Sequence, residues 1–288
     1  MPENIRLRSV RPTDREAVAH IEAGAMPNHR YLEEVFDEFI ADERGGFGIA
    51  EIDGRPAGCG KFTILPDGSA WLESLRVSPE YQGLGVGKEF YRWFFHLARP
   101  RGVTTMRMYT GVTNAASKGL AELFGFSVAA TFRGALAAPE HLPETGPPGT
   151  LSPIDDPGEV RMTAARGRRE WGDFTVMNRT FFTFSPDTLR AWAREGKFYG
   201  DSLGNIAFMG ARFMPEREFH IAYLGGDAEV GLREGIARAR ETGVSKIACL
   251  FPPHRTDIGD LLRRWGFSFD AHEFIVMEGA LDEDDSSS

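Results

Sequence analysis

The sequence contains little of what defines several large classes of protein. Only 2 of its 288 residues are cysteines, Cys59 and Cys249, which are too few for a disulfide scaffold or a zinc cluster. No apolar run approaches the roughly 18 residues of a membrane helix. The first eight residues show neither the apolar core nor the cleavage site of a secretory signal. We therefore expect a soluble, cytoplasmic protein without membrane partners and without a metal site.

Basic charge is also scarce. The chain has 33 lysines and arginines against 42 aspartates and glutamates, which gives a formal net charge of −9. Non-specific binding to nucleic acids depends on a basic surface, so we expect no nucleic-acid partner. The hydrophobic fraction of 42% and the charged fraction of 26% are typical of soluble globular proteins. The length suits one large domain or two domains of medium size.

Prolines mark a seam near the middle of the chain. Six of the 17 prolines stand there, at Pro139, Pro143, Pro147, Pro148, Pro153 and Pro157. Proline fixes φ and lacks an N–H donor, so this stretch favours neither a helix nor a central strand. We predict a first domain over 1–135, a linker or crossing arm over 136–158, a second domain over 159–281 and a disordered acidic tail over 282–288.

The first half alternates between strand-like and helix-like patterns. The predicted strands are 5–10, 47–52, 57–65, 70–77, 104–110 and 126–132, and the predicted helices are 17–25, 31–41, 86–97 and 115–124. Thr13 is the expected cap of the first helix, with Glu16 as its capping-box partner. The half is therefore of mixed α and β class.

The second half repeats landmarks of the first at a constant offset. A shift of 141 residues places Gly125-Phe126-Ser127 on Gly266-Phe267-Ser268 and Gly102-Val103 on Gly243-Val244. A duplication of the first half would explain why the matches share one constant offset. The alternative is chance, because short Gly-Phe matches are common.

The most informative stretch is Gln82-Gly83-Leu84-Gly85-Val86-Gly87, which follows a predicted strand and opens a predicted helix. Glycines let several backbone N–H groups point toward one place, and the helix start adds a positive partial charge, so the loop suits a phosphate. A glycine-rich turn that only redirects the chain is the alternative. The glycine spacing fits neither a dinucleotide fingerprint nor a P-loop, because Glu89 follows Lys88 where a P-loop needs serine or threonine.

Together with Leu75-Arg76-Val77-Ser78-Pro79, this loop resembles the strand and the acyl-CoA loop of the GCN5-related N-acetyltransferase (GNAT) family. The resemblance covers about 5–132 and continues to Asn114 and the Gly125-Phe126 pair. It implies tandem GNAT-like domains of α/β (α+β) class, each with a mixed, mostly antiparallel sheet flanked by helices. It also implies acetyl-CoA as co-substrate.

The resemblance assigns roles to particular residues. The implied acyl-CoA contacts are the main chain of Leu75 and Val77 at the pantetheine, the loop residues Gln82, Gly83, Leu84, Gly85, Val86, Gly87 and Lys88 at the pyrophosphate, and Asn114 near the sulfur. Glu73 is the implied base and the Leu75 N–H the implied oxyanion donor. Lys88 can equally be an ordinary surface lysine, and Glu73 an ordinary strand residue.

One position departs from the family pattern. The slot four residues before Gly125, where the family usually has a tyrosine, is Ala121. Tyr109 or a water is then the candidate acid, although Tyr109 also suits a packing role. We expect acetyl transfer to a primary amine, of a small molecule more readily than of a protein. A non-catalytic acyl-CoA sensor or interaction module is the alternative, and a homodimer stays open.

The second half lacks the glycine-rich loop of the first half. Its local sequence is Leu224-Gly225-Gly226-Asp227, and a helix is predicted from Ala228. Asp227 suits a helix cap and opposes a pyrophosphate by its charge. We therefore expect a degenerate second domain.

Overall fold

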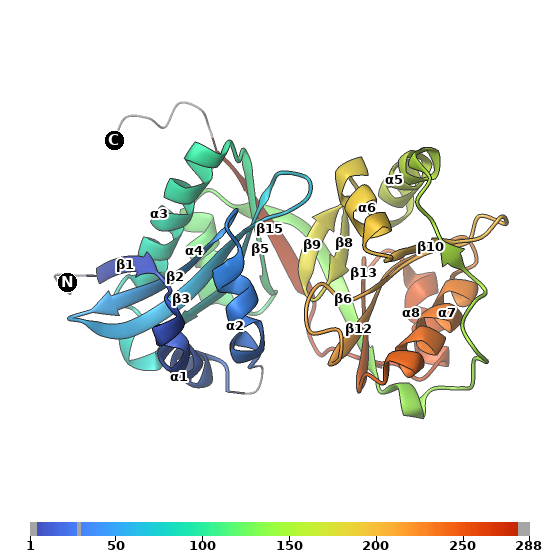
Figure 1. Cartoon of the computed structure of the whole chain (residues 1–288), viewed down its shortest axis with the longest axis horizontal. Coiled ribbons are helices and arrows are strands. Elements are labelled where there is room, and N and C mark those ends of the chain that lie inside the picture. The colour runs from blue at the N-terminus through green and yellow to red at the C-terminus, as the bar shows by residue number, and fades with distance from the viewer. Residues whose placement is uncertain (1–4, 28–29, 282–288) are drawn as a thin grey trace. The chain divides into compact units, whose positions relative to one another are not determined.

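The computed structural model describes residues 5–27 and 30–281, so the predicted acidic tail lies outside the described residues. The chain forms two compact units (Figure 1). Unit 1 comprises Met1–Met108, Ala115–Ser127 and Met277–Ser288, and unit 2 comprises Tyr109–Asn114 and Val128–Val276. Strands β5, β6 and β15 therefore contribute residues to both units. The domain boundaries drawn from the sequence stay a prediction.

Unit 1 has a sheet with strand order β1-β2-β3-β4-β5-β15. Its strands are β1 (Ile5–Ser9), β2 (Gly46–Ile52), β3 (Arg55–Ile64), β4 (Ala70–Val77), β5 (Thr105–Gly111) and β15 (Phe274–Ala280), and its helices are α1 (Arg15–Ala25), α2 (Leu32–Ala41), α3 (Val86–Ala98) and α4 (Ala115–Leu123). The pairs β1–β2, β2–β3 and β3–β4 are antiparallel, and β4–β5 is parallel. The sheet is thus mixed and mostly antiparallel, as expected.

Glycines bring helix α3 close to one face of this sheet. Successive side chains of a strand point to opposite faces, so Gly58 and Gly60 share the face that also carries Phe62. A Cβ at Gly60 would lie 2.9 Å from Phe90, and the rings of Phe62 and Phe94 stack at 6.3 Å. The absence of side chains at these positions therefore lets the aromatic stripe of α3 reach the backbone of β3.

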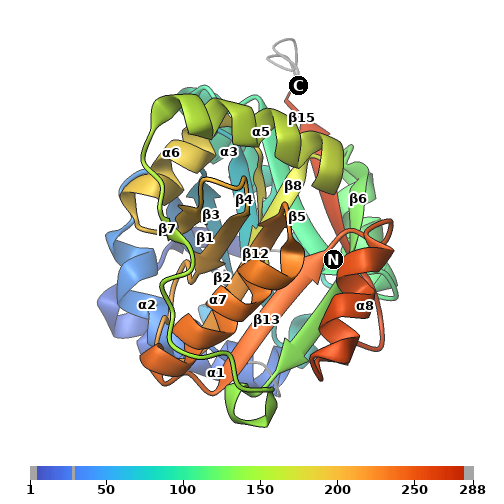
Figure 2. The ribbon, with the colours of Figure 1, turned by 90° about the vertical axis from the view of Figure 1, so that its right-hand side faces the viewer.

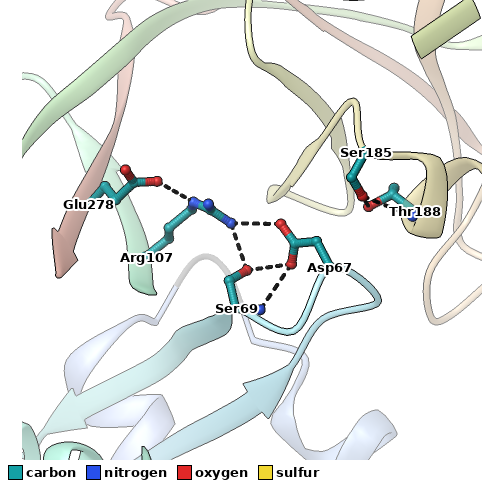
Figure 3. A network of polar contacts seen from close by, with 6 residues as sticks. All are labelled: Asp67, Ser69, Arg107, Ser185, Thr188 and Glu278. Atoms are coloured by element: carbon teal, nitrogen blue, oxygen red, sulfur yellow. Dashed lines mark hydrogen bonds and ion pairs between the residues drawn. The ribbon is translucent and has the colours of Figure 1, made fainter. Parts of the chain in front are cut away.

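Strand β15 and the residue after it complete unit 1. Leu281 donates its N–H to the Thr104 carbonyl at 2.9 Å, and Glu278 on β15 accepts from Arg107 on β5 at 2.6 Å. Arg107 is 7% exposed and also binds Asp67 and Ser69 in the β3–β4 connection (Figure 3). One buried guanidinium thus joins three segments that are far apart in sequence.

In unit 2 the strand order is β6-β13-β12-β11-β10-β7, and Figure 2 shows β6, β13 and β12 of this series. Its strands are β6 (Ser127–Ala137), β7 (Ser152–Pro153), β8 (Phe174–Met177), β9 (Thr180–Thr183), β10 (Phe198–Gly200), β11 (Ile206–Gly210), β12 (Glu218–Gly225), β13 (Lys246–Phe251) and β14 (Ser268–Phe269), and its helices are α5 (Pro157–Trp171), α6 (Pro186–Arg194), α7 (Ala228–Thr242) and α8 (Thr256–Arg264). As in unit 1, one parallel pair, β12–β13, stands among antiparallel pairs. Strands β8 and β9 form a separate hairpin, in which the tight turn places Asn178 and Arg179 at positive φ.

Two local expectations need correction. The Thr13 cap is wrong, because a 3₁₀ turn at Pro12–Asp14 leads directly into α1 and makes Asp14 the N-cap residue. The strand predicted over 126–132 extends to Ala137, because its last five residues pair with β13. The proline-rich stretch that follows is tied to unit 2 by Arg240, whose guanidinium donates to the carbonyls of Pro139 and Leu142.

Candidate functional site

Strand β4 carries a bulge where its sequence passes from Glu73 to Leu75. The register pairs Lys61 with Glu73 and Cys59 with Arg76, so Ser74 and Leu75 together oppose one residue of β3, Gly60. Ser74 has a φ of 58°, in the left-handed region that a non-glycine residue rarely adopts. Such a bulge bends the strand and re-aims the side chains beside it.

The bulge coincides with the point where β4 and β5 stop pairing. Their parallel register contains Ala70 with Met106 and Trp71 with Arg107, and among the described residues it goes no further. The main chain of Leu75 therefore has no register partner on β3 or β5 in the described part of the chain. A backbone segment of this kind can pair with an extended ligand, as a sheet edge does.

The loop after β4 owes its shape to three glycines. Gly83 has a φ of 79° and Gly85 a φ of 96°, both in the left-handed region where glycine is favoured, and Gly85 is the N-cap residue of α3. Gly87 serves a different purpose, since a Cβ there would lie 2.8 Å from the Leu120 side chain of α4. Two glycines thus turn the backbone, and the third lets two helices approach.

The same loop presents a set of backbone donors. The first N–H groups of a helix have no partner within it, and no side chain caps α3. The N–H groups without an acceptor among the residues that the structure describes are those of Gly83, Gly85, Val86, Gly87 and Lys88. Gly83, Leu84 and Lys88 are exposed, so the donors are accessible to a ligand. With the partial positive charge of the helix start, the loop suits an anion such as a pyrophosphate.

Two side chains next to the loop bind main-chain carbonyls. Gln82 donates its side-chain amide to the Val77 carbonyl at 3.1 Å, and Arg76 donates to the Leu75 carbonyl at 3.2 Å. Gln82, which the sequence suggested as a phosphate contact, therefore connects the loop to the end of β4. Lys88 lies exposed on the first turn of α3.

Glu73 is a buried carboxylate at the start of the bulge. It is 7% exposed, and its Oε1 accepts a hydrogen bond from the Thr63 hydroxyl at 2.6 Å. The sequence offered no motif for Thr63, but the cross-strand register places it diagonally opposite Glu73. A buried carboxylate that accepts a hydrogen bond from a hydroxyl at a strand bulge is a candidate proton acceptor.

Tyr31, the residue before α2, lies beside the bulge. The Tyr31 hydroxyl and the Ser74 hydroxyl are hydrogen-bonded at 2.6 Å, and Glu22 accepts the backbone N–H of Tyr31 and of Leu32. Burial of the Glu22 carboxyl raises its pKa. The start of α2 thereby lies against the strained residue of β4.

The remaining predicted residues lie elsewhere or lack the expected chemistry. Tyr109 and Asn114 belong to unit 2, where the ring of Tyr109 stacks on Phe181 at 6.1 Å and its hydroxyl is hydrogen-bonded with Arg179. Asn114 is exposed just before α4. Ala121 is fully buried, so that slot in unit 1 provides no hydroxyl.

The sequence of unit 1 matches a known protein family. Residues 15–126 match the family model for the acetyltransferase (GNAT) family. These residues form a GNAT acetyltransferase domain. No curated protein matches the sequence.

Solved structures share the fold of the whole chain. A GCN5-related N-acetyltransferase from Sphaerobacter thermophilus has a TM-score of 0.67 at 16% identity, with 97% of this chain and 96% of that chain covered. A putative acetyltransferase from Pyrococcus horikoshii has a TM-score of 0.64 at 17% identity, covering 97% and 90%. One from Thermoplasma acidophilum has a TM-score of 0.63 at 15% identity, covering 96% and 100%. At these identities the likeness concerns the fold.

The start of α7 in unit 2 differs from the GNAT loop of unit 1. Asp227 caps this helix by accepting the Glu229 N–H at 3.0 Å, and its own N–H donates to the Asn205 side chain at 2.8 Å. Gly226 keeps a φ of 77°, but a Cβ there would lie 2.7 Å from the Gly204 carbonyl. At the start of α7, side chains of Asp227 and Asn205 thus bind N–H groups, whereas the corresponding start of α3 has no side-chain cap. The prediction of an Asp227 cap is confirmed.

Strand β12 also lacks a counterpart of Glu73. After its last pair with β13, at His220, it continues as Ile221-Ala222-Tyr223-Leu224-Gly225, without a carboxylate. The Thr175 hydroxyl, from the β8–β9 hairpin, donates to the Ala222 carbonyl at 2.7 Å. The Ala222 carbonyl of β12 is therefore bound by a side chain from another element, whereas the Leu75 and Val77 carbonyls of β4 accept from Arg76 and Gln82, which are close in sequence.

Neither a metal centre nor a membrane segment emerges. Within residues 5–27 and 30–281 no group of three or more histidine, cysteine, aspartate or glutamate side chains is arranged to hold a metal ion. In the same residues no helix is both long and apolar enough to span a bilayer.

Proposed function

We propose that this chain is an acetyl-CoA-dependent N-acetyltransferase that works at unit 1 and acetylates a primary amine, most readily of a small molecule. The observation that carries the proposal is the α3 start, with accessible N–H groups on a backbone shaped by Gly83 and Gly85. These donors match the pyrophosphate of CoA in charge and direction. The net charge of −9 favours the approach of a cationic amine.

The residues around the bulge supply the proton chemistry. Transfer forms a bond between the amine nitrogen and the acetyl carbon, breaks the thioester C–S bond and releases a proton from nitrogen. Glu73 is proposed to accept that proton, directly or through water, because its carboxylate is buried and held by Thr63. The Leu75 N–H, on the bulge, is proposed to donate to the oxyanion.

Tyr109 stays the candidate donor of a proton to the leaving sulfur, because Ala121 provides none. Its hydroxyl is hydrogen-bonded with Arg179. Asn114 is kept as a proposed contact to the sulfur end of CoA.

Unit 2 is proposed to be a degenerate GNAT-like domain that binds no acyl-CoA. The capped start of α7 and the engaged carbonyl of Ala222 support this proposal. The position of Asp227 adds a negative charge where a pyrophosphate would need positive partial charge. The expected stoichiometry is therefore one acetyl-CoA per chain.

A non-catalytic acyl-CoA sensor is the second candidate, and the buried Ala121 favours it. Calorimetric titration of acetyl-CoA, followed by a screen of primary amines for CoA release, separates the two. We expect one site per chain and release with at least one amine. Glu73→Gln should keep the affinity for acetyl-CoA and lower kcat by about 10²–10⁴-fold. Binding without release for any amine would support the sensor, and no binding would refute both.

A further inference from the structure

Thr63 and Glu73 form a contact that the fold specifies closely. Thr63 stands opposite Trp71, and Glu73 stands opposite Lys61, so the two side chains are diagonal neighbours on one face of the β3–β4 pair. The hydrogen bond from the Thr63 hydroxyl to Glu73 Oε1 is 2.6 Å long and partly buried. Both ends lie on strands, which hold side chains more firmly than loops do.

The connection between the two strands is itself fixed. Leu65 donates its N–H to the Ser69 carbonyl at 2.8 Å, and Asp67 accepts from the Ser69 hydroxyl at 2.5 Å. Arg107 donates to both Asp67 and Ser69, as Figure 3 shows. A slip of β3 along β4 would break these bonds, so the diagonal pair of Thr63 and Glu73 is maintained by its surroundings.

The donor to Glu73 Oε1 in this pair is a neutral hydroxyl. Lys61, the residue directly opposite Glu73, binds the Asp42 carboxylate and donates to the Phe62 carbonyl at 2.9 Å. A neutral donor restricts rotation of a carboxylate and brings no positive charge of its own. Such a donor sets the direction of the carboxylate oxygens and leaves their negative charge in place.

We infer that Thr63 is a positioning residue for proton acceptance by Glu73. The inference rests on the proposed function of Glu73 as the base. Thr63 acts through Glu73: its hydroxyl fixes the carboxylate in the orientation from which the amine proton is taken. Orientation of a general base affects the chemical step and not the binding of acetyl-CoA at the α3 start.

Two pairs of variants isolate the hydroxyl. Thr63→Val keeps the β-branched shape and removes the donor, and Thr63→Ser keeps the donor and removes a methyl group. We expect Thr63→Val to lower kcat by about tenfold with an unchanged Kd for acetyl-CoA, and Thr63→Ser to stay within about twofold of wild type. If Thr63→Val does not fold, Thr63→Ala compared with Thr63→Ser tests the same hydroxyl. Thr105→Val, on the neighbouring β5, is the matched control and should keep wild-type kcat.

A double variant separates positioning from a general structural effect. In a Glu73→Gln background, Thr63→Val should lower the residual kcat by less than twofold, because the base that Thr63 orients is already absent. A tenfold loss in both backgrounds, or wild-type kcat in Thr63→Val, would overturn the inference. If Glu73→Gln itself keeps full activity, the proposed function of Glu73 fails instead.

Discussion

Helices α3 and α7 each connect the two strands of a parallel pair, but only α7 has a side-chain cap at its first turn. The α3 start has a glycine at the N-cap, no side-chain cap and accessible backbone donors. The α7 start has Asp227 at the N-cap and Asn205 bound to its N–H. A helix start needs acceptors for its first N–H groups. Unit 2 supplies acceptors from its own side chains, whereas the α3 start of unit 1 has no side-chain cap among the described residues.

The difference bears on the proposal that unit 1 binds acetyl-CoA and unit 2 does not. In unit 2 the missing glycine phosphate loop, the missing carboxylate on β12 and the occupied backbone of Ala222 occur together. The Asp227 cap and the bond from Thr175 to the Ala222 carbonyl each satisfy a polar group internally, which favours the folded state. A ligand would then have to displace bonds that the chain already makes. The following predictions test the contrast, from the largest expected effect to the smallest.

The largest effect should come from charging the open loop. Gly85→Glu with Gly87→Glu places two carboxylates at the α3 start, forces a side chain onto a φ of 96° and crowds Leu120. We expect the Kd for acetyl-CoA to rise by about 1,000-fold or more, which corresponds to roughly 4 kcal/mol. Calorimetric titration measures it. Gly102→Glu adds one carboxylate at a φ of 65° beyond the other end of α3 and should keep wild-type affinity. An equal loss of affinity in this control would contradict the assignment.

Acid should weaken unit 2 through Glu218. Burial opposes ionisation of this carboxyl, but His220 and the Lys246 ammonium, 2.8 Å away, outweigh it and lower its pKa to about 2. Because this pKa is lower in the folded state than its unfolded value of 4.5, the ionised carboxylate stabilises the fold above pH 4.5. That stabilisation is lost as the pH falls toward 2. The contribution is about 3 kcal/mol at neutral pH. Urea unfolding should show that Glu218→Gln has a lower free energy of unfolding than wild type at neutral pH. This difference between the two proteins should be roughly halved by about pH 3. A difference in unfolding free energy that stays constant with pH would contradict the assignment to Glu218.

Each unit contains one cysteine that reports on it. Cys59 and Cys249 are both buried, and burial raises the pKa of each thiol to about 12, so both should be inert in the native state. In moderate urea, acetyl-CoA at 100 times its Kd should slow alkylation of Cys59 by about 100-fold. Cys249 should be labelled at an unchanged rate, as followed by mass spectrometry. Equal slowing at both cysteines would show that acetyl-CoA stabilises unit 2 as well, which would contradict the proposed difference between the two units.

The smallest effect should come from removing the cap of α7. Asp227→Ala deletes the acceptor for the Glu229 N–H and should cost about 1 kcal/mol of stability, seen as a lower Tm. Acetyl-CoA should still bind at one site per chain, because β12 and Asn205 remain as they are. A second equivalent of bound acetyl-CoA would show that the cap alone closes unit 2.

Local sequence predicted most of the elements of unit 1 because their signals are local. The alternation of apolar residues gave β4 as Ala70–Val77, and the glycine loop gave a helix that starts at Val86. The cap at Thr13 failed because a 3₁₀ turn held by Asp14 precedes α1. Strand β6 was predicted too short, since pairing with β13, more than 100 residues away, extends it.

What the sequence determined by itself is the chemistry of contiguous residues: glycines that allow left-handed backbone at the α3 start, and an aspartate that caps α7. Those properties depend on the residue's own conformational range and on neighbours one turn away. Only the tertiary structure decided that Thr63 donates to Glu73, that Asn205 binds the start of α7 and that the last strand completes unit 1. Such contacts follow from strand register and chain topology, which bring together segments that no local pattern connects.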